Sequence, residues 1–214
     1  MSKLFFRYGA MNSGKSTALL QVAHNYEERG QRVLLIKPAV DTKGDHHIVS
    51  RLGVSRLADI VLGPEDSLKD ALKKQLISRD TTVKAIDCLL IDEAQFLAPE
   101  QVEEALEIAV RTGVPVIAYG IRTDFRTRSF PGSQRLMEIA HKLEELKTIC
   151  RCGSKAIFNA RLTNGGIAID GEQIMIDEQE ARYEALCASC YLDQRAALDH
   201  GQLDILDEQV GTQP

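Results

Sequence analysis

The sequence predicts an α/β fold, with a parallel sheet flanked by helices and a small metal-stapled unit after it. Three observations support this prediction. Short apolar runs alternate with amphipathic helical patterns along most of the chain. Between the first run and the first helical pattern lies a glycine-rich segment, Gly9-Ala-Met-Asn-Ser-Gly14-Lys15-Ser16. Two close cysteine pairs follow much later, Cys150 with Cys152 and Cys187 with Cys190.

The bulk properties indicate a soluble globular protein. A length of 214 residues is enough for one well-buried core and a small satellite. The net charge of -5 provides no basic field to draw the protein onto nucleic acid or an anionic membrane, so we expect neither as a partner. The N-terminus has no signal-peptide pattern, and no apolar run reaches membrane-spanning length. We therefore expect a cytoplasmic protein, and in that compartment close cysteine pairs bind metal more often than they form disulfides.

The strands are expected where apolar residues follow one another without interruption. Such runs are typical of strands buried on both faces, as in a parallel sheet. Four runs have this character: Leu4–Tyr8, Val33–Ile36, Cys88–Ile91 and Val114–Tyr119.

The helices are expected where apolar residues recur every three or four positions. The first three inward stripes are Leu19, Ala23 and Tyr26, then Leu68, Leu72 and Leu76, then Val102, Leu106, Ala109 and Val110. The first of these helices is expected to end at Gly30. A fourth helix is predicted over Ser133–Leu146, with Leu136, Ile139, Ala140 and Leu143 facing inward. This alternation implies right-handed crossovers between parallel strands.

The character of the sequence changes after Leu146. Residues 148–192 contain both cysteine pairs, a turn signal at residues 164–166 and short strand-like runs at residues 167–169 and 173–176. This is too little apolar sequence for an independent core, so a metal staple is expected. We predict a phosphate-loop domain over residues 1–147, a metal-binding unit over residues 148–192 and a tail, at first helical, over residues 193–214.

The glycine-rich segment matches the phosphate-loop pattern G-x-x-x-x-G-K-[ST] in full, between a strand and a helix as the P-loop NTPase (RecA-like) fold requires. In such a loop the backbone N–H groups bind phosphate oxygens, Lys15 reaches the β- and γ-phosphates and Ser16 ligates Mg²⁺. The alternative is a chance match on an ordinary strand–turn–helix. We assign to the ATP site Gly9, Ala10, Met11, Asn12, Ser13, Gly14, Lys15 and Ser16, with Asp92, Glu93, Ala94 and Gln95 from the end of a later strand.

Two carboxylates follow the strand Cys88–Ile91, where a phosphoryl-transfer site needs acidic groups. Asp92 is placed to hold Mg²⁺ together with Ser16. Glu93 is placed to accept a proton from an attacking hydroxyl or water. The alternative is that both carboxylates cap the next helix, although Glu100 lies nearer its first turn.

The two cysteine pairs predict a zinc site formed by Cys150, Cys152, Cys187 and Cys190. Four thiolates suit tetrahedral Zn²⁺, and close pairs separated by a strand-rich insertion resemble a zinc ribbon. The alternative is two disulfides. The fifth cysteine, Cys88, lies within an apolar run and is expected to be a core residue.

Taken together, these motifs resemble those of thymidine kinases of the zinc-containing, tetrameric type. The resemblance extends from about residue 3 to residue 192 and rests on the phosphate loop, on Ile91-Asp-Glu-Ala-Gln-Phe96, on Tyr119-Gly-Ile-Arg-Thr-Asp-Phe125 and on the cysteine pairs with Arg182-Tyr183 before the second. It implies transfer of the γ-phosphoryl group of ATP to the 5′-hydroxyl of thymidine, with deoxyuridine also accepted, in pyrimidine salvage for DNA synthesis. It further implies Mg²⁺ with ATP, structural Zn²⁺, a homotetramer and feedback inhibition by thymidine triphosphate (dTTP).

The resemblance also assigns residues. Glu93 would be the general base, and a loop from about Ala160 to Tyr183, the lasso, would close over the base. Asp41 and Lys43 match a pair near the sugar and phosphates. The implied nucleoside site comprises Met11, Phe96, Ile121, Phe125 and Phe130 as walls, Ile174, Met175 and Ile176 as backbone hydrogen-bonding partners of the pyrimidine, and Tyr183 as a packed ring. The sequence carries Asp177-Glu178-Gln179-Glu180 where family members commonly have Gly-Gly.

Composition supports a pocket around the phenylalanines independently. The chain has no Trp and six Phe, and three of these lie between residues 96 and 130 outside the helical stripes. They can wall a pocket for a flat base, or they can pack beneath their own loops. The basic residue that stabilises the transferred phosphoryl group stays open among Arg122, Arg126, Arg161 and Lys43.

Two other functions compete with the kinase. A phosphate-loop ATPase could grip nucleic acid with its zinc ribbon, but acidic residues outnumber basic ones in residues 148–192. A nucleotide-dependent switch would hydrolyse slowly, and it has no need for Glu93 as a base beside a magnesium carboxylate.

Overall fold

The computed structural model describes residues 2–42, 44–79, 82, 85–163, 166–173 and 182–197. Its centre is a six-stranded sheet in the order β5-β2-β6-β7-β1-β8, and every neighbouring pair in it is parallel. The strands are β1 (Leu4–Tyr8), β2 (Val33–Pro38), β5 (Ile60–Leu62), β6 (Cys88–Ile91), β7 (Val116–Gly120) and β8 (Lys142–Glu145). The predicted α/β fold is confirmed.

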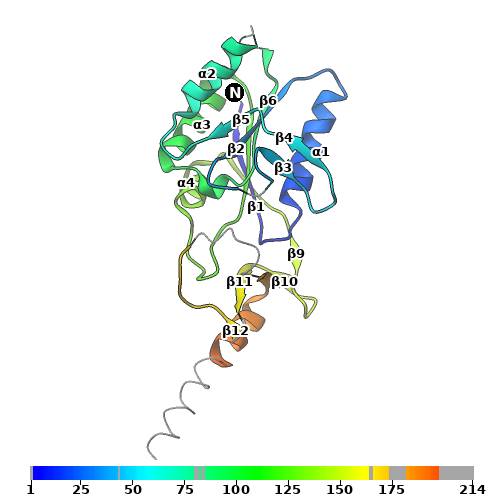
Figure 1. Cartoon of the computed structure of the whole chain (residues 1–214), viewed down its shortest axis with the longest axis vertical. Coiled ribbons are helices and arrows are strands. Elements are labelled where there is room, and N and C mark those ends of the chain that lie inside the picture. The colour runs from blue at the N-terminus through cyan, green and yellow to red at the C-terminus, as the bar shows by residue number, and fades with distance from the viewer. Residues whose placement is uncertain are drawn as a thin grey trace, which may run out of the picture.

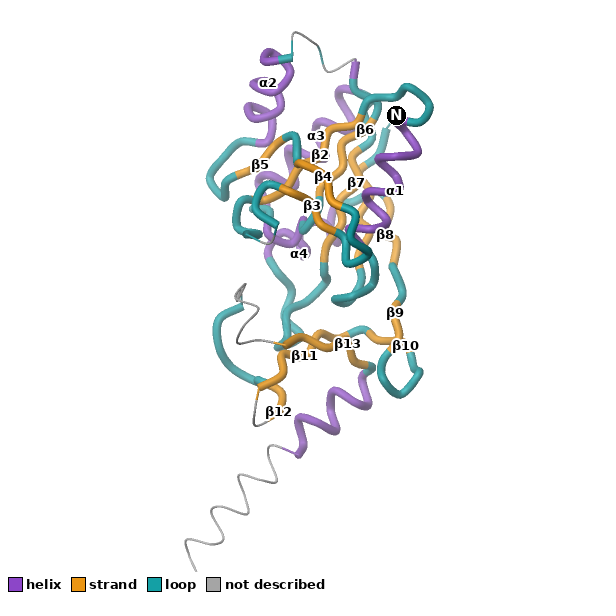
Figure 2. The backbone as a smooth tube through the Cα atoms, turned by 45° about the vertical axis from the view of Figure 1, so that its right-hand side comes forward, coloured by secondary structure: helices purple, strands orange, loops and turns teal. Residues whose placement is uncertain are grey.

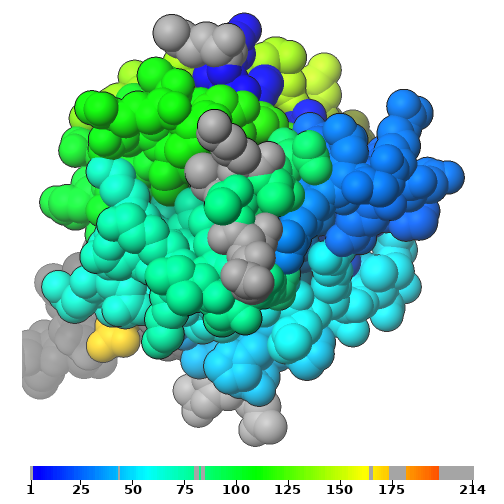
Figure 3. All heavy atoms as spheres, turned by 90° about the horizontal axis from the view of Figure 1, so that it is seen from above, coloured from blue at the N-terminus to red at the C-terminus, as the bar shows by residue number. Residues whose placement is uncertain are grey.

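Helices cover both faces of this sheet (Figure 1). Helix α1 (Lys15–Glu27) covers one face. The other face carries α2 (Leu68–Ser78), α3 (Pro99–Thr112) and α4 (Pro131–Ile139). Seen from above, the blue residues near α1 and the green residues near α3 occupy opposite sides of the surface (Figure 3).

The uninterrupted apolar runs are explained by these two layers. In β2, Leu34 and Ile36 belong to the core beneath α2, α3 and α4, whereas Val33 and Leu35 belong to the core beneath α1. Successive strand residues point to opposite faces, and both faces here are covered. All four side chains are 3% exposed or less, so neither face offers a solvent-exposed position for a polar residue.

The prediction of a fourth helix over Ser133–Leu146 is wrong in its second half. Helix α4 ends at Ile139, and Lys142–Glu145 form β8, a parallel edge strand beside β1. Two hydrogen bonds turn the chain toward the sheet: the His141 backbone N–H donates to the Leu4 carbonyl (2.9 Å), and the Leu4 N–H donates to His141 Nδ1 (3.1 Å). Leu143 is accordingly 45% exposed instead of inward.

Other helix details differ in smaller ways. In α3, Val102 and Ala109 are buried as predicted, but Val110 is 37% exposed and Ile108 takes the inward place. Helix α1 ends at Glu27, and Gly30 lies in the turn beyond it, with a positive φ of 72°.

An antiparallel hairpin that the sequence did not predict lies near α1. It consists of β3 (His47–Val49) and β4 (Ser55–Leu57). Its Ile48 is buried in the same core as α1. At its base the buried Lys37 ammonium donates to the carbonyls of Asp45 (2.8 Å) and His47 (3.1 Å) and pairs with Asp41 (3.2 Å). Burying that charge is tolerable because it is multiply bonded.

A smaller unit lies beyond the carboxyl ends of the main strands (Figure 2). It contains β9 (Thr148–Ile149), β10 (Lys155–Ala156), β11 (Phe158–Thr163), β12 (Gly166–Ile167) and β13 (Arg182–Leu186), followed by helical residues 188–197. Its core is small, with Ala156, Ala160, Ile167, Leu186 and Tyr191 among its members. The predicted strand at 167–169 is shorter, and most of the predicted run 173–176 lies outside the described residues.

Candidate functional site

The phosphate loop connects β1 to α1 at the carboxyl edge of the sheet. At Gly9 an added Cβ would lie 2.4 Å from Ser13 Oγ and 2.5 Å from the Leu146 carbonyl oxygen, so only glycine fits there. Gly14 has a φ of 76° immediately before α1, a conformation that glycine adopts without strain. The sequence motif thus forms the tight loop that phosphate binding requires.

Lys15 points back into this loop. Its ammonium donates to the Ala10 carbonyl at 3.0 Å, and the residue is 7% exposed. Burial lowers the pKa of Lys15, while the negative charges of Glu93 and Asp92 oppose that shift. Lys15 is therefore held beside both carboxylates that follow β6.

The end of β6 places one carboxylate in a buried position. Asp92 is 4% exposed, and its Oδ1 has no hydrogen-bond partner among the described residues. Burial raises the pKa of Asp92 to about 7 with help from the charge of Glu93, whereas a hydrogen bond with Ser16 lowers it. A buried carboxylate oxygen without a partner, next to the Ser16 hydroxyl, is a donor set that fits a hard cation such as Mg²⁺.

Glu93 has a strained backbone conformation. Its φ is 46°, in the left-handed region that non-glycine residues rarely occupy. Gln95 fixes the side chain by donating from Nε2 to Glu93 Oε2 (2.6 Å), and its own Oε1 accepts from the Ile121 N–H (3.1 Å). The carboxylate makes no cap hydrogen bond, and α3 begins only at Pro99, so the structure does not support the capping alternative.

Gly120 allows this arrangement. An added Cβ at Gly120 would lie 2.9 Å from Gln95 Oε1 and 3.1 Å from the Gln95 nitrogen. The short 3-10 helix η2 (Ala94–Phe96) can therefore press against the end of β7. This contact brings the residues after β6 and β7 into one site.

Three of the predicted pocket walls follow β7 or the loop after it. Ile121, Phe125 and Phe130 are all 8% exposed or less. The rings of Phe96 and Phe130 meet edge to face, with centroids 5.7 Å apart. Phe125 instead packs against a cation, because the Arg161 guanidinium lies 3.8 Å from its ring centroid. Phe96 and Phe130 thus contact each other, whereas Phe125 contacts Arg161 and, at 5.5 Å from its ring centroid, Arg126.

Arg161 links this aromatic group to the small unit. It is 3% exposed, its Nε donates to the Tyr183 hydroxyl (2.9 Å), and its NH2 donates to the Glu172 carbonyl (2.8 Å). Its side-chain N–H groups therefore bind residues of the predicted lasso. This distinguishes Arg161 from the other basic residues considered for stabilising the transferred phosphoryl group. Arg126 pairs with Asp124 (3.4 Å).

Arg122, directly after Ile121, makes no hydrogen bond or ion pair within the described part of the chain. Asp41 is engaged by Lys37. The other predicted residues Lys43, Ile174, Met175 and Ile176 lie outside the described residues, as does the acidic stretch 177–180.

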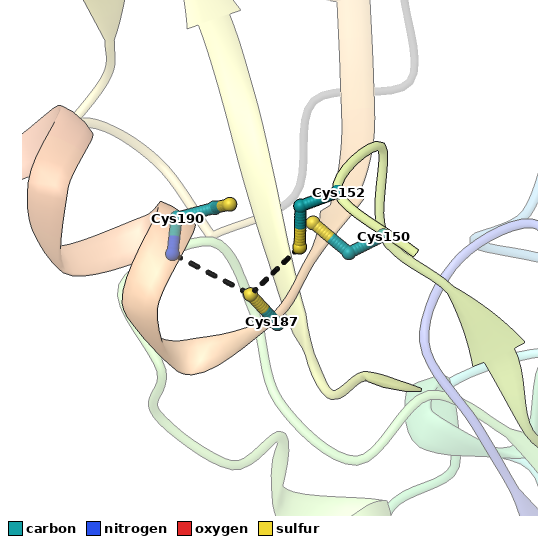
Figure 4. Close-up of side chains that lie close together, drawn as sticks. All are labelled: Cys150, Cys152, Cys187 and Cys190. Atoms are coloured by element: carbon teal, nitrogen blue, oxygen red, sulfur yellow. Dashed lines mark hydrogen bonds between the residues drawn. The ribbon is translucent and has the colours of Figure 1, made fainter. Parts of the chain in front are cut away.

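The four cysteines of the small unit converge as predicted (Figure 4). The Sγ atoms of Cys150, Cys152, Cys187 and Cys190 all lie within 4.8 Å of one another, and those of Cys152 and Cys187 are 3.6 Å apart. A tetrahedron of sulfurs around zinc, with Zn–S of about 2.3 Å, has edges of about 3.8 Å. All four cysteines are free, so the disulfide alternative is wrong. This group can hold a metal ion.

Electrostatics favour a cation at this position. Hydrogen bonds to Ser154 lower the pKa of the Cys152 thiol to about 6, so it is a thiolate at neutral pH. The neighbouring cysteines, Cys152 first, raise the pKa of Cys190 to about 12, because further negative charge is unfavourable there. A bound divalent cation would remove that conflict. Cys88 lies apart, fully buried in β6, as predicted for a core residue.

One site residue was not predicted from the sequence. Asn159 in β11 accepts from the Met11 N–H of the phosphate loop (2.7 Å) and donates to the Thr123 carbonyl (2.8 Å). Its partners are 148 and 36 residues away along the chain, and no motif marks it. The Met11 N–H is therefore already bonded within the protein.

Known proteins resemble this chain over most of its length. A family model described as thymidine kinase matches residues 2–191. A thymidine kinase of Legionella pneumophila (strain Paris) is 47% identical over 193 residues, covering 89% of this chain and 90% of that protein. One of Enterobacteria phage T4 is 44% identical over 189 residues, covering 87% and 94%, and one of Rhodopirellula baltica is 39% identical over 209 residues, covering 97% and 96%.

Among solved structures, the Pif1 helicase of Candida albicans aligns with a TM-score of 0.41 and 17% identity, covering 70% of this chain and 37% of that one. This likeness is too weak to bear on function. No helix in the described ranges has both the length and the hydropathy to cross a membrane.

Proposed function

The chain belongs to the thymidine kinase family, and on that premise we propose that it transfers the γ-phosphoryl group of ATP to the 5′-hydroxyl of thymidine, giving thymidine monophosphate and ADP. One observation carries the proposal for this chain. Three charged groups meet at one edge of the sheet: Lys15 of the phosphate loop, the buried Asp92, and Glu93, which Gln95 holds by a hydrogen bond. The ring pair of Phe96 and Phe130 lies next to them along the chain. Groups that can bind phosphate thus lie on one side of the Glu93 carboxylate, and groups that can bind the nucleoside base lie on the other.

On the phosphate side, Lys15 binds the β- and γ-phosphates together with the N–H groups at the start of α1. Asp92 and Ser16 would hold Mg²⁺, and the ion would supply positive charge to offset the negative charge of the phosphates. Among the described candidates, Arg122 is the basic residue left for the transferred group, since Arg126 pairs with Asp124 and Arg161 serves the lasso. We propose Arg122 for that role.

On the acceptor side, Glu93 takes the proton of the 5′-hydroxyl as the oxygen attacks the γ-phosphorus. Gln95 keeps the carboxylate oriented by its 2.6 Å hydrogen bond, and its second hydrogen bond fixes the Ile121 backbone beside it. An oriented carboxylate needs no reorganisation when the hydroxyl arrives.

The nucleoside is proposed to lie between walls formed by Met11, Phe96, Ile121, Phe125 and Phe130, with Tyr183 beneath the lasso. The backbone of Ile174, Met175 and Ile176 is proposed to bind the edge of the pyrimidine. Deoxyuridine differs from thymidine only by one methyl group, so we expect it to be accepted as well.

The small unit is proposed to hold a structural Zn²⁺ through its four cysteines, and we propose residues 1–147, 148–192 and 193–214 as the functional parts of the chain. A homotetramer, feedback inhibition by dTTP, a cytoplasmic location and the absence of nucleic-acid and membrane partners are proposed from the family resemblance and the acidic composition.

A nucleoside panel tests the proposal directly. The purified protein is incubated with Mg·ATP and each nucleoside in turn, and ADP release and nucleoside monophosphate are measured. Thymidine and deoxyuridine are expected to turn over, and purine nucleosides are not. ADP release that does not depend on any nucleoside would instead indicate an ATPase. Native mass spectrometry of the same sample tests the metal, and a mass without zinc would refute that part.

A further inference from the structure

Asn159 occupies the junction between the small unit and two loops of the large one. Its Oδ1 accepts from the Met11 N–H at 2.7 Å, and its Nδ2 donates to the Thr123 carbonyl at 2.8 Å. The residue is 2% exposed, so water does not substitute for either contact. One buried amide therefore ties the phosphate loop to the loop that follows β7.

The two contacts serve the two halves of the proposed site. Met11 lies within the phosphate loop, between Gly9 and Lys15. Thr123 lies between Ile121 and Phe125, both of which are proposed pocket walls. A displacement of Asn159 would therefore disturb the ATP side and the nucleoside side together.

The position of Asn159 depends on the small unit. In β11 it lies opposite Ala185 of β13, two residues before the metal-site residue Cys187. Arg161 lies on the same face of β11, because alternate strand residues point the same way, and it stacks on Phe125. This face of β11 thus carries two buried polar side chains, and both contact the loop after β7.

We propose that Asn159 is a positioning residue for the kinase reaction, which couples the assembled small unit to the geometry of the phosphate loop and the nucleoside loop. The expected change in the KM for thymidine rests on the proposed function. The expected change in the affinity for Mg·ATP does not depend on it. Asn159 is not proposed to touch either substrate. It acts by keeping the Met11 N–H and the Thr123 carbonyl bonded.

The test uses the full-length, zinc-loaded protein and three variants. Asn159→Leu keeps the branched shape of the side chain but removes both hydrogen bonds. Asn159→Asp keeps the oxygen that faces Met11 and loses the donor to Thr123. Asn25→Leu is the matched control, because it makes the same substitution at an exposed position of α1 and removes a side-chain hydrogen bond from Gln21 (2.9 Å). Circular dichroism, zinc content and the unfolding midpoint are measured for each.

The readouts are the dissociation constant of Mg·ATP by calorimetry and the KM for thymidine, both well below the unfolding midpoint. We expect Asn159→Leu to weaken both about tenfold, the effect of leaving buried polar groups without partners. Asn159→Asp should bind Mg·ATP more tightly than Asn159→Leu while its thymidine KM stays raised. Asn25→Leu should change neither constant by more than about twofold.

Several outcomes would overturn the inference. Asn159→Leu could lower only the unfolding midpoint and leave both constants unchanged, which would make the residue merely structural. The same conclusion follows if neither Asn159 variant folds, or if Asn159→Asp binds Mg·ATP no better than Asn159→Leu. If the wild type fails to phosphorylate thymidine, the proposed function fails, and the Mg·ATP titrations still decide the role of Asn159.

Discussion

At the scale of single residues, the conformation of Glu93 is the most telling feature of the site. A positive φ of 46° in a non-glycine residue costs free energy and is retained where the surrounding structure enforces it. Here Gln95 and the close approach of Gly120 enforce it, and the carboxylate is directed away from any helix-capping role. That restraint is consistent with a general base held ready for its hydroxyl.

We predict that Glu93→Gln lowers kcat by about 10²- to 10⁴-fold, the usual contribution of a positioned base. Mg·ATP should still bind, since Lys15 and the phosphate loop are unchanged. Steady-state kinetics and calorimetry measure the two effects. Glu100→Gln, an exposed glutamate at the start of α3, is the control and should leave kcat unchanged. Near wild-type turnover in Glu93→Gln would exclude this residue as the base.

A second prediction at this scale concerns Arg161. Lysine keeps the charge but cannot stack on the Phe125 ring or bond Tyr183 and Glu172 with one planar group. Arg161→Lys is therefore expected to raise the KM for thymidine about tenfold, the effect of one buried interaction. The KM for ATP should change little. Arg128→Lys in the exposed part of the same loop is the control, and an unchanged thymidine KM in Arg161→Lys would contradict the assignment.

At the scale of elements, local patterns predicted most of the fold because most elements carry their own signal. Strands β1 and β6 begin and end where their apolar runs do, and the inward stripe of α2 is the one expected. The prediction for β8 was wrong because Lys142–Glu145 continues the helical spacing of α4 and has little apolar content. Its strand conformation comes from pairing with β1, which is 137 residues away at Arg7 and Glu144.

The site shows the same division. The phosphate loop, the carboxylates and the cysteines are marked by spacing within short segments, so the sequence revealed them. Asn159 and the stacking of Arg161 on Phe125 depend on how β11 meets a loop from another part of the chain. Tertiary contacts of this kind leave no local pattern, and a lone Asn in a strand is not a signal.

Strand β8 gives a prediction about stability and pH. Glu144 accepts from Arg7 Nε (2.6 Å), and the hydrogen bond from Lys142, with desolvation opposing it, lowers the pKa of Glu144. A carboxyl whose pKa is lower in the folded state stabilises the fold above its unfolded pKa, and this stabilisation is lost as the pH falls through the folded pKa.

Glu144→Gln should therefore lower the free energy of unfolding by about 1 kcal/mol at neutral pH. The difference from wild type should shrink as the pH falls from the unfolded pKa of about 4.3 through the lower folded pKa, because the wild-type carboxyl then becomes protonated as well. Urea unfolding at several pH values measures it, with Glu65→Gln, an exposed loop residue, as the control. A difference that stays constant down to acid pH would show that the charge of Glu144 contributes nothing.

At the scale of the whole molecule, the chain places its chemistry where the two units meet. The carboxyl ends of β1, β6 and β7 supply the phosphate loop, the carboxylates and the aromatic walls. The small unit supplies Asn159 and Arg161 from one face of β11, and its own core is too small to hold that face in place without help. We therefore expect the cysteine site to affect catalysis through the position of β11, at a distance from the proposed ATP site.

Removal of the metal tests this view of the whole molecule. A zinc-selective chelator, with free Mg²⁺ held constant, should lower the unfolding midpoint and the thymidine affinity, because the pairing of β11 with β13 loses its staple. It should also weaken Mg·ATP binding about as much as Asn159→Leu does, about tenfold, because both changes release the Met11 N–H.

In the Asn159→Leu protein, removal of zinc should cause little further loss of Mg·ATP affinity, since two changes that act through one contact are not additive. Added Zn²⁺ should restore the wild type. Full Mg·ATP affinity in the metal-free wild type would show instead that the phosphate loop keeps its geometry without the small unit.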